Sequence, residues 1–324
     1  MDSFKDGLTY IIPSIHLFDE GLQVELNGYE SRVYWNIREV QDTDGTYESI
    51  WKTFGGRGVK DIAKAVALIR LEPLHKTMDP LRSDKAYRLI TDMVNGKLKQ
   101  REENELILIL AECYTKLPEV YQTLEEPAKA QIEHAPSEID PKPMVKLIRA
   151  MNRLFKKKIS SISSWASVDE SLPVLLLASM SLYPYTRGLS PKAAMKTADS
   201  LLLDTFYRAG LKNIQYDEKL SRVITHAAAL FGVADQYWDK DTLKAFSSIM
   251  SDEGAQNLAQ CNEYQGIIWY NKEEMQRIIL LTALAWSLPP AADKDFEIDV
   301  YVQEMLDREI RSGYQLGKLL ERTE

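Results

Sequence analysis

The stretch Ser171–Tyr185, SLPVLLLASMSLYPY, is the most apolar part of the chain and decides its fold class. It is bounded by Pro173 and Pro184, and it is shorter than the roughly 18 apolar residues that a membrane-spanning helix needs. A helix that is apolar on every side belongs in a protein core. The sequence therefore predicts a buried core helix at this position.

Helical periodicity dominates the chain on both sides of this stretch. Val59, Ile62, Val66 and Ile69 form one apolar stripe, with Pro73 at its end. Similar stripes recur at about 80–95, 100–116, 143–160, 171–182, 190–211, 216–232, 240–250, 271–287 and 296–321. We therefore predict a mainly α fold of about ten helices, arranged as a multi-helix bundle or an orthogonal helical array.

The first fifty residues follow a different pattern, which predicts a small N-terminal antiparallel β-hairpin. Asn27-Gly28 lies between two β-rich runs and suits a type I′ turn. After it, Val33, Trp35 and Ile37 alternate with polar residues, as in a strand with one buried face. A lone hairpin is marginal in water, so it must pack on the helices or on a domain outside this chain. We expect a β-hairpin element, a helical lobe and a larger helical lobe, at 1–52, 53–135 and 136–324.

Composition narrows the classes of function. The chain has 324 residues, of which 45% are hydrophobic, so it can bury a sizeable core. Its net charge of −8 opposes binding to nucleic acid and to anionic membranes. The two cysteines lack metal-site spacing, the four histidines lie far apart, and the stretch MDSFKDGLTYII does not have the pattern of a targeting segment. We expect a cytoplasmic protein with no metal and no cofactor.

The stretch Cys261–Ile279, CNEYQGIIWYNKEEMQRII, holds the densest group of candidate binding residues. Asn271 is a good N-cap for the helix that follows. Before it, Tyr264, Trp269 and Tyr270 could offer flat faces to sugar rings, or could anchor a loop in the core. The stretch is therefore either a binding site or a structural connection between helices.

Three carboxylates are candidates for catalysis. Glu263 could act as a general acid if apolar surroundings raised its pKa, and Asp235 and Asp239 are possible partners. Glycoside hydrolysis usually needs two carboxyl groups at a defined separation, which the sequence alone does not give. We therefore expect that the chain is not an enzyme by itself. The alternative is an enzyme in which these three carboxylates act in catalysis.

The segment FGGRGVKD, residues 54–61, is a possible anion site. Backbone N–H groups at the start of a helix could bind an anion beside Arg57. The segment matches neither G-x-x-x-x-G-K-[ST] nor G-x-G-x-x-G, and a tight glycine turn explains it equally well.

Three blocks in one order, IPSIHLFDEGLQVELNGYESRVYWNIREVQD, FGGRGVKDIAKAVALIRLEPLHK and NEYQGIIWYNKEEMQRII, cover much of the chain. Together they resemble the C-terminal region of bacterial proteins of the α-amylase family, glycoside hydrolase family 13, where a short β segment and a helical accessory region follow the catalytic barrel. The chain lacks the alternating strands and helices of that barrel and its catalytic motifs. The positions that most resemble the family pattern are His16, Trp35, Arg57, Asn262, Tyr264, Trp269 and Asn271.

The resemblance implies a non-catalytic helical accessory or interaction module in carbohydrate metabolism, with an α-glucan or maltooligosaccharide as ligand. Its protein partner would be a catalytic (β/α)8 domain or another protein. Two alternatives stay open. The first is an autonomous (α/α)-toroid glycosidase or lyase, and the second is a helical protein-binding scaffold unrelated to sugars.

Overall fold

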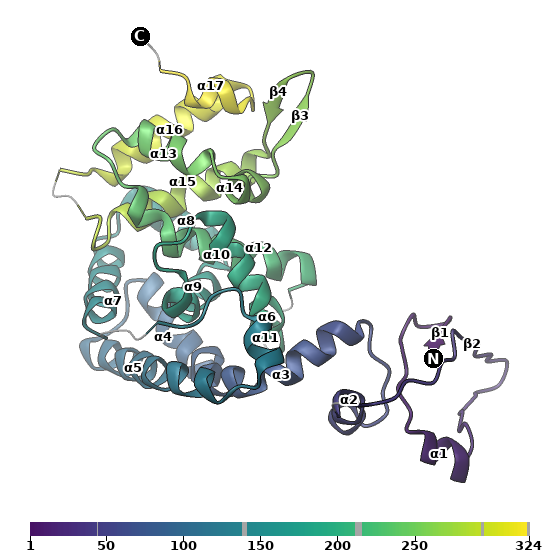
Figure 1. Ribbon diagram of the computed structural model, residues 1–324. Helices are drawn as coiled ribbons and strands as arrows, with labels where there is room; N and C mark the ends of the chain where they lie inside the picture. Colours follow the sequence, from purple (N-terminus) through teal and green to yellow (C-terminus); the bar gives the residue numbers. More distant parts are fainter. Residues whose placement is uncertain (44, 138–140, 211–215, 293–294, 323–324) are drawn as a thin grey trace. The chain divides into compact units, whose positions relative to one another are not determined.

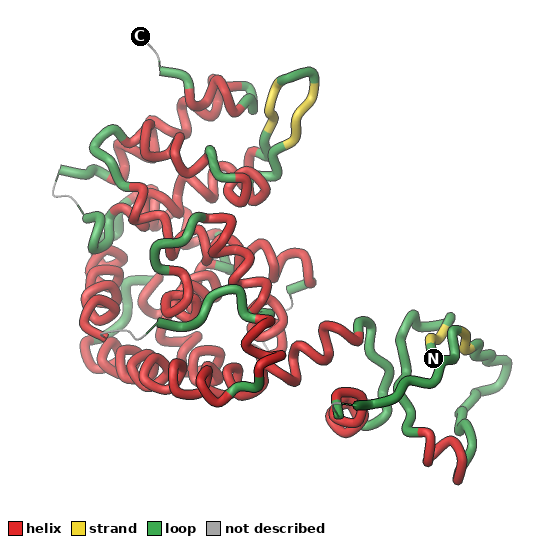
Figure 2. The backbone as a smooth tube through the Cα atoms, viewed as in Figure 1, coloured by secondary structure: helices red, strands yellow, loops and turns green. Residues whose placement is uncertain are grey.

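The computed structural model describes residues 1–43, 45–137, 141–210, 216–292 and 295–322. Helices dominate this part of the chain, and two small antiparallel sheets accompany them (Figure 2). The prediction of a mainly α fold with a small N-terminal antiparallel element is confirmed. The chain divides into two compact units, the first made of Met1–Pro73 with Glu125–Ala128 and the second of the remaining residues.

The first unit contains short elements around a small core. Its elements in chain order are β1 (Asp2–Ser3), α1 (Ser14–Asp19), β2 (Tyr34–Trp35), α2 (Thr46–Phe54) and the first part of α3 (Ile62–Met78) (Figure 1). Ile50, Val59 and Ala65 form the core, and partly buried apolar residues such as Ile11 and Phe54 pack against it. This core joins α2 to the start of α3.

The N-terminal sheet does not have the hairpin partner that the sequence suggests. A turn does form at Asn27, whose carbonyl accepts from the N–H of Glu30 at 3.0 Å, but the runs on either side of it do not pair. Instead β2 pairs with β1, with Ser3 opposite Tyr34. Polar contacts fix this choice, since the carboxylate of Asp2 accepts from Asn36 Nδ2 at 2.8 Å. The prediction of a hairpin closed by Asn27-Gly28 is therefore wrong, because β1 supplies the paired strand.

The second unit is an array of helices. Its elements in chain order are the end of α3, η1 (Asp79–Arg82), α4 (Asp84–Val94), α5 (Gln100–Thr123), the end of α6 (Glu126–Gln131), α7 (Pro141–Lys156), α8 (Ser160–Val168), α9 (Leu172–Thr186), α10 (Pro191–Ser200), α11 (Leu203–Gly210), α12 (Glu218–Ala234), η2 (Asp235–Tyr237), α13 (Thr242–Met250), α14 (Glu253–Leu258), β3 (Asn262–Tyr264), β4 (Ile267–Trp269), α15 (Lys272–Trp286), α16 (Ile298–Ser312) and α17 (Leu316–Leu320).

Helix α9 forms the centre of this unit, as the apolar stretch predicts. All but one of its residues are buried, and it packs against α4, α10 and α12. One of its polar side chains, Ser181, is hydrogen-bonded inside the core: Ser181 Oγ lies 2.6 Å from the hydroxyl of Tyr207, which also donates to the carbonyl of Leu177 at 2.9 Å. The unit is thus built around one almost completely buried helix.

Some of the expected helices are split by residues with positive φ. Leu202, with φ of 50°, separates α10 from α11, and Gly313 and Tyr314, with φ of 57° and 67°, separate α16 from α17. These conformations lie outside the helical region of backbone space, so the helix must stop there. The described residues consequently form more and shorter helices than the sequence pattern predicts.

The division of the chain differs from the expected boundaries at residues 52 and 135. It falls at Pro73, within α3, because the start of α3 shares a core with α2. Within the described ranges, no helix combines the length and the apolar character needed to cross a bilayer.

Candidate functional site

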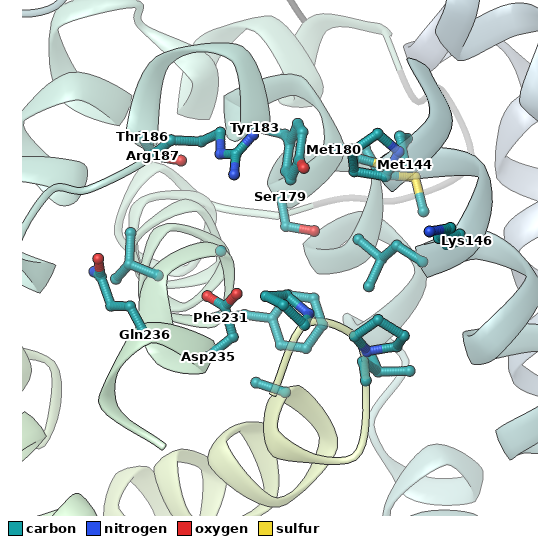
Figure 3. A pocket seen from close by; sticks show the side chains of 18 of the residues that line it. Met144, Lys146, Ser179, Met180, Tyr183, Thr186, Arg187, Phe231, Asp235 and Gln236 are labelled. Atoms are coloured by element: carbon teal, nitrogen blue, oxygen red, sulfur yellow. The ribbon is translucent and has the colours of Figure 1, made fainter. Parts of the chain in front are cut away.

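The candidate site is a cavity of about 670 Å³ in the helical unit, located beside the C-terminal ends of α9 and α12 (Figure 3). The lining comes from α7, α9, α12, α15 and the segments that follow them: Lys142, Pro143, Met144, Lys146, Leu147, Met151, Ser179, Met180, Tyr183, Thr186, Arg187, Gly188, Phe231, Gly232, Val233, Asp235, Gln236, Ala285, Leu288, Pro289 and Pro290. This volume lies within the usual range for small-molecule sites.

Two neighbouring helix ends place the charged residues of the cavity. Arg187 directly follows α9 and Asp235 directly follows α12. The two helices pack closely, and a Cβ added at Gly232 would lie 3.7 Å from Thr186 Oγ1. Arg187 and Asp235 point into the same end of the cavity (Figure 3).

A stack of aromatic rings positions Arg187. Its guanidinium carbon lies 5.8 Å from the centroid of the Tyr183 ring, which stacks on Tyr114 at 6.1 Å and 14°. Tyr114 is itself fixed, since its hydroxyl donates to the carbonyl of Met180 at 2.6 Å. A cation over an aromatic ring is attracted by its negative face. Arg187 therefore keeps a defined position at the cavity while its N–H groups are left for a ligand.

Asp235 is a half-buried carboxyl with a perturbed pKa. Burial raises its pKa, and the N–H of Gln236 and the cation of Arg187 offset part of that rise. Burial also raises the pKa of Tyr183, while the nearby charge of Arg187 lowers it and that of Asp235 raises it. Within the described part of the chain, neither Arg187 nor Asp235 has an ion-pair partner. The two groups are within electrostatic reach of each other and are not neutralised by direct contact.

The rest of the lining is mainly apolar with a few polar atoms. Phe231 lies beside Asp235, and Met144 and Met180 lie toward the end where Lys146 stands (Figure 3). Ser179 Oγ donates to the carbonyl of Leu176 at 2.8 Å, which leaves its oxygen free to accept a hydrogen bond from a ligand. The cavity thus has Arg187 and Asp235 at one end, and two methionines with Lys146 toward the other.

The arrangement suits binding of a molecule with both polar and apolar parts. Arg187 can donate, Asp235 can accept, and a protonated Asp235 could also donate. Among the residues that the structure describes, no group of three or more His, Cys, Asp or Glu side chains could hold a metal ion. The residues that line the cavity can therefore bind a ligand through hydrogen bonds, charge interactions and apolar contacts.

The three candidate carboxylates lie in different settings. Asp235 lines the cavity, whereas Asp239 pairs with Lys244 Nζ at 2.7 Å, and this hydrogen bond lowers the pKa of Asp239. Glu263 is exposed on β3, opposite Ile268 of β4, and is not part of the cavity lining. The structure does not bring the three together at this cavity.

The stretch around Trp269 forms a hairpin rather than an irregular loop. Gln265 and Gly266 connect β3 to β4 with φ of 52° and 75°, as a tight hairpin turn requires. Tyr264 is exposed on this hairpin, and Trp269 at the end of β4 is half-buried. Of Tyr264, Trp269 and Tyr270, only Tyr264 is therefore exposed.

Tyr270 and Asn271 have structural partners. Tyr270 is buried, and its hydroxyl lies 2.5 Å from Ser312 Oγ. Asn271 is the N-cap of α15 and accepts from the N–H of Glu274 at 3.1 Å, as the sequence predicts. Both anchor the hairpin to neighbouring helices.

Arg57 and Trp35 belong to the first unit. Arg57 follows the Gly55-Gly56 turn, and its Nε donates to the carbonyl of Phe54 at 3.0 Å. Trp35 is in β2 and is exposed. Gly56 approaches Trp51 so closely that an added Cβ would lie 2.6 Å from its ring, so close packing explains this glycine.

Sequence reasoning missed Arg187 and Tyr183. Both belong to YPYTRGLSP, whose prolines and glycine predict only a loop between two helices. The one available signal is a basic residue directly after the most apolar stretch of the chain. A cation is stabilised there by the negative end of the helix dipole.

No protein-family model, curated protein or solved structure matches the chain.

Proposed function

We propose that the chain is a non-catalytic helical binding module whose second unit holds a saccharide, an α-glucan or maltooligosaccharide, in the cavity of Arg187 and Asp235. The observation that carries the proposal is the pair itself. A cation and a carboxyl point into one end of a cavity of about 670 Å³, and neither has an ion-pair partner among the described residues.

Sugar hydroxyls fit this pair because each hydroxyl both donates and accepts hydrogen bonds. A hydroxyl can accept from the guanidinium of Arg187 while a neighbouring one donates to the carboxylate of Asp235. Hydrogen bonds that involve a charged partner contribute about 1.5–3 kcal/mol each. The apolar face of a sugar ring would then contact the wall formed by Phe231, Met180 and Leu288.

The family resemblance supports the choice of an α-glucan over other polyols. Its blocks occur in the order found in the accessory region of α-amylase-family proteins, where a helical module accompanies carbohydrate chemistry. A cytoplasmic location, with Cys113 and Cys261 both unpaired, would suit this role.

The alternative, an (α/α)-toroid glycosidase, has one observation in its favour. The raised pKa of Asp235 is typical of a general acid. In the lining formed by described residues, however, Asp235 is the only carboxylate, whereas glycoside hydrolysis usually uses two. We therefore favour binding without turnover.

Calorimetry with a maltooligosaccharide series tests the proposal, with a β-linked glucan as the control ligand and with reducing ends assayed in the same samples. We expect saturable binding of the α-linked series and no new reducing ends. Arg187→Met removes the donors and should weaken binding about tenfold or more, which corresponds to the loss of about 1.4 kcal/mol. Arg322→Met, at an exposed ion pair outside the cavity, is the matched control.

Two results would contradict the proposal. Equal affinity of the wild type and Arg187→Met would place any sugar elsewhere on the chain. If the wild type releases reducing ends and Asp235→Asn does not, the chain is a glycosidase and not a binding module.

A further inference from the structure

Apolar side chains are concentrated on the surface of the first unit. Twelve of the twenty exposed large apolar residues of the described chain lie within its first forty residues: Phe4, Ile15, Leu17, Phe18, Leu22, Val24, Leu26, Tyr29, Val33, Trp35, Ile37 and Val40. Such a concentration is typical of a surface that another molecule covers.

In segment 22–26, exposed apolar side chains occur together with backbone groups that make no backbone hydrogen bond within the described ranges. Leu22, Val24 and Leu26 alternate with Gln23 and Glu25, which is the pattern of a strand with one apolar face. All five residues are exposed. Within the ranges described, the structure gives no backbone hydrogen bond to residues 22–26. A segment whose backbone N–H and C=O groups are unpaired is able to accept a further strand.

The negative charge of the N-terminal region indicates which kind of partner strand would bind to segment 22–26. Residues 1–43 contain eight carboxylates and three basic side chains. Lys5 and Arg32 both pair with Glu30, so the region keeps an excess of negative charge that is not neutralised by them. Glu25 lies within the segment itself, where it would face a side chain of an added strand. A partner strand with lysine or arginine is therefore favoured, and an anionic lipid surface is disfavoured.

We propose that segment 22–26 is a docking site for an extended segment of a partner protein in which apolar and basic residues alternate. Backbone hydrogen bonds would provide the pairing, as in other cases of strand addition. The apolar residues of the partner would cover Leu22, Val24 and Leu26, and its basic residues would face the surrounding carboxylates. This inference does not depend on the sugar cavity, which belongs to the other unit.

A labelled ten-residue peptide of alternating valine and lysine tests the proposal with the full chain. We expect saturable fluorescence anisotropy, binding that weakens with salt, and slower amide hydrogen exchange at residues 22–26 in the complex. The double variant Leu22→Lys with Leu26→Lys should weaken binding at least tenfold. The control variant Val168→Lys with Ile310→Lys changes two exposed apolar residues on helices and should bind as the wild type does.

Four results would overturn the proposal. The first is no saturable binding, and the second is equal binding of a peptide that alternates valine with glutamate. The third is slow exchange at residues 22–26 in the free chain, which would mean that the chain covers this segment itself. The fourth is a dimer of the free chain that Leu22→Lys with Leu26→Lys converts to a monomer, since the occupant would then be a second copy.

Discussion

The indole Nε1 of Trp286 donates to the carbonyl oxygen of Ala234 at 2.9 Å. Ala234 is the last residue of α12, so this bond ties the end of α15 to the residue before Asp235. Trp286 is fully buried and contacts the rings of Trp238 and Tyr301. The position of the carboxyl in the cavity therefore depends on a tryptophan that does not line it.

Trp286→Phe should destabilise the protein by about 2 kcal/mol, because the variant loses a buried hydrogen bond and leaves space beside α12. Urea unfolding followed by circular dichroism measures the loss. Trp35→Phe, at an exposed position, should change stability by less than about 0.5 kcal/mol. An equal effect of the two substitutions would show that the bond to Ala234 contributes little.

Asp235→Asn should raise the melting temperature at pH 7. Burial raises the pKa of Asp235, so folding disfavours its charged form, and the protein loses stability as pH rises through the unfolded pKa toward the higher folded one. The asparagine removes this cost, and the gain should be at most a few degrees. Thermal unfolding at pH 3 and pH 7 checks it: the gain should appear at pH 7 and disappear at pH 3. A lower melting temperature at pH 7 would contradict the account.

Asp199→Asn should act in the opposite direction. Burial alone would raise the pKa of Asp199, but hydrogen bonds from His226 at 2.9 Å and from Arg222 at 2.7 Å outweigh it and lower the pKa. A lowered pKa stabilises the fold above the unfolded value of about 3.9, and this contribution is lost as pH falls further.

Because Asp199 is partly exposed, the loss at pH 7 should be small, about 1 kcal/mol after solvent screening. Stability measured from pH 7 to pH 2 should fall less steeply below pH 4 in Asp199→Asn than in the wild type. Parallel curves would show that Asp199 does not contribute to acid unfolding.

Tyr270→Phe should cost about 1 kcal/mol, because it removes the hydrogen bond of 2.5 Å to the buried Ser312 hydroxyl, which keeps its bond to the carbonyl of Glu309. Tyr264→Phe, on the exposed part of the same hairpin, should change stability by less than about 0.5 kcal/mol. Chemical unfolding of the two variants separates an anchoring residue from a surface one. If Tyr264→Phe proved the more damaging, the hairpin would be held differently.

The fold class could be predicted because its signals are local. The apolar run of α9 is the buried central helix, and Asn271 is the N-cap that its position suggests. The pairing of β1 with β2 could not be predicted from the Asn27-Gly28 turn, since a turn limits only the residues beside it. The choice of Asp2–Ser3 as partner depends on contacts between residues far apart in the sequence, such as Asp2 and Asn36.

The candidate site was predictable only in part. Asp235 stood out as a carboxylate, but its environment comes from α7, α9 and α15, which meet it only in the folded chain. Arg187 is placed by Tyr183, whose ring is in turn placed by Tyr114, so its role depends on packing rather than on a motif. Sequence periodicity identifies helices but not the residues that face each other at their ends.

The most direct measurement is a maltotriose titration of the wild type and of two variants at Gly232, a residue that lines the cavity and carries none of its charges. Gly232→Ala adds a Cβ in ordinary contact with Thr186, so it should bind as the wild type does and be more stable by about 0.5–1 kcal/mol. Gly232→Leu should narrow the cavity beside Asp235 and weaken binding while its circular dichroism stays that of a folded helical protein. If Gly232→Leu folds and binds maltotriose with wild-type affinity, the cavity of Arg187 and Asp235 is not the binding site.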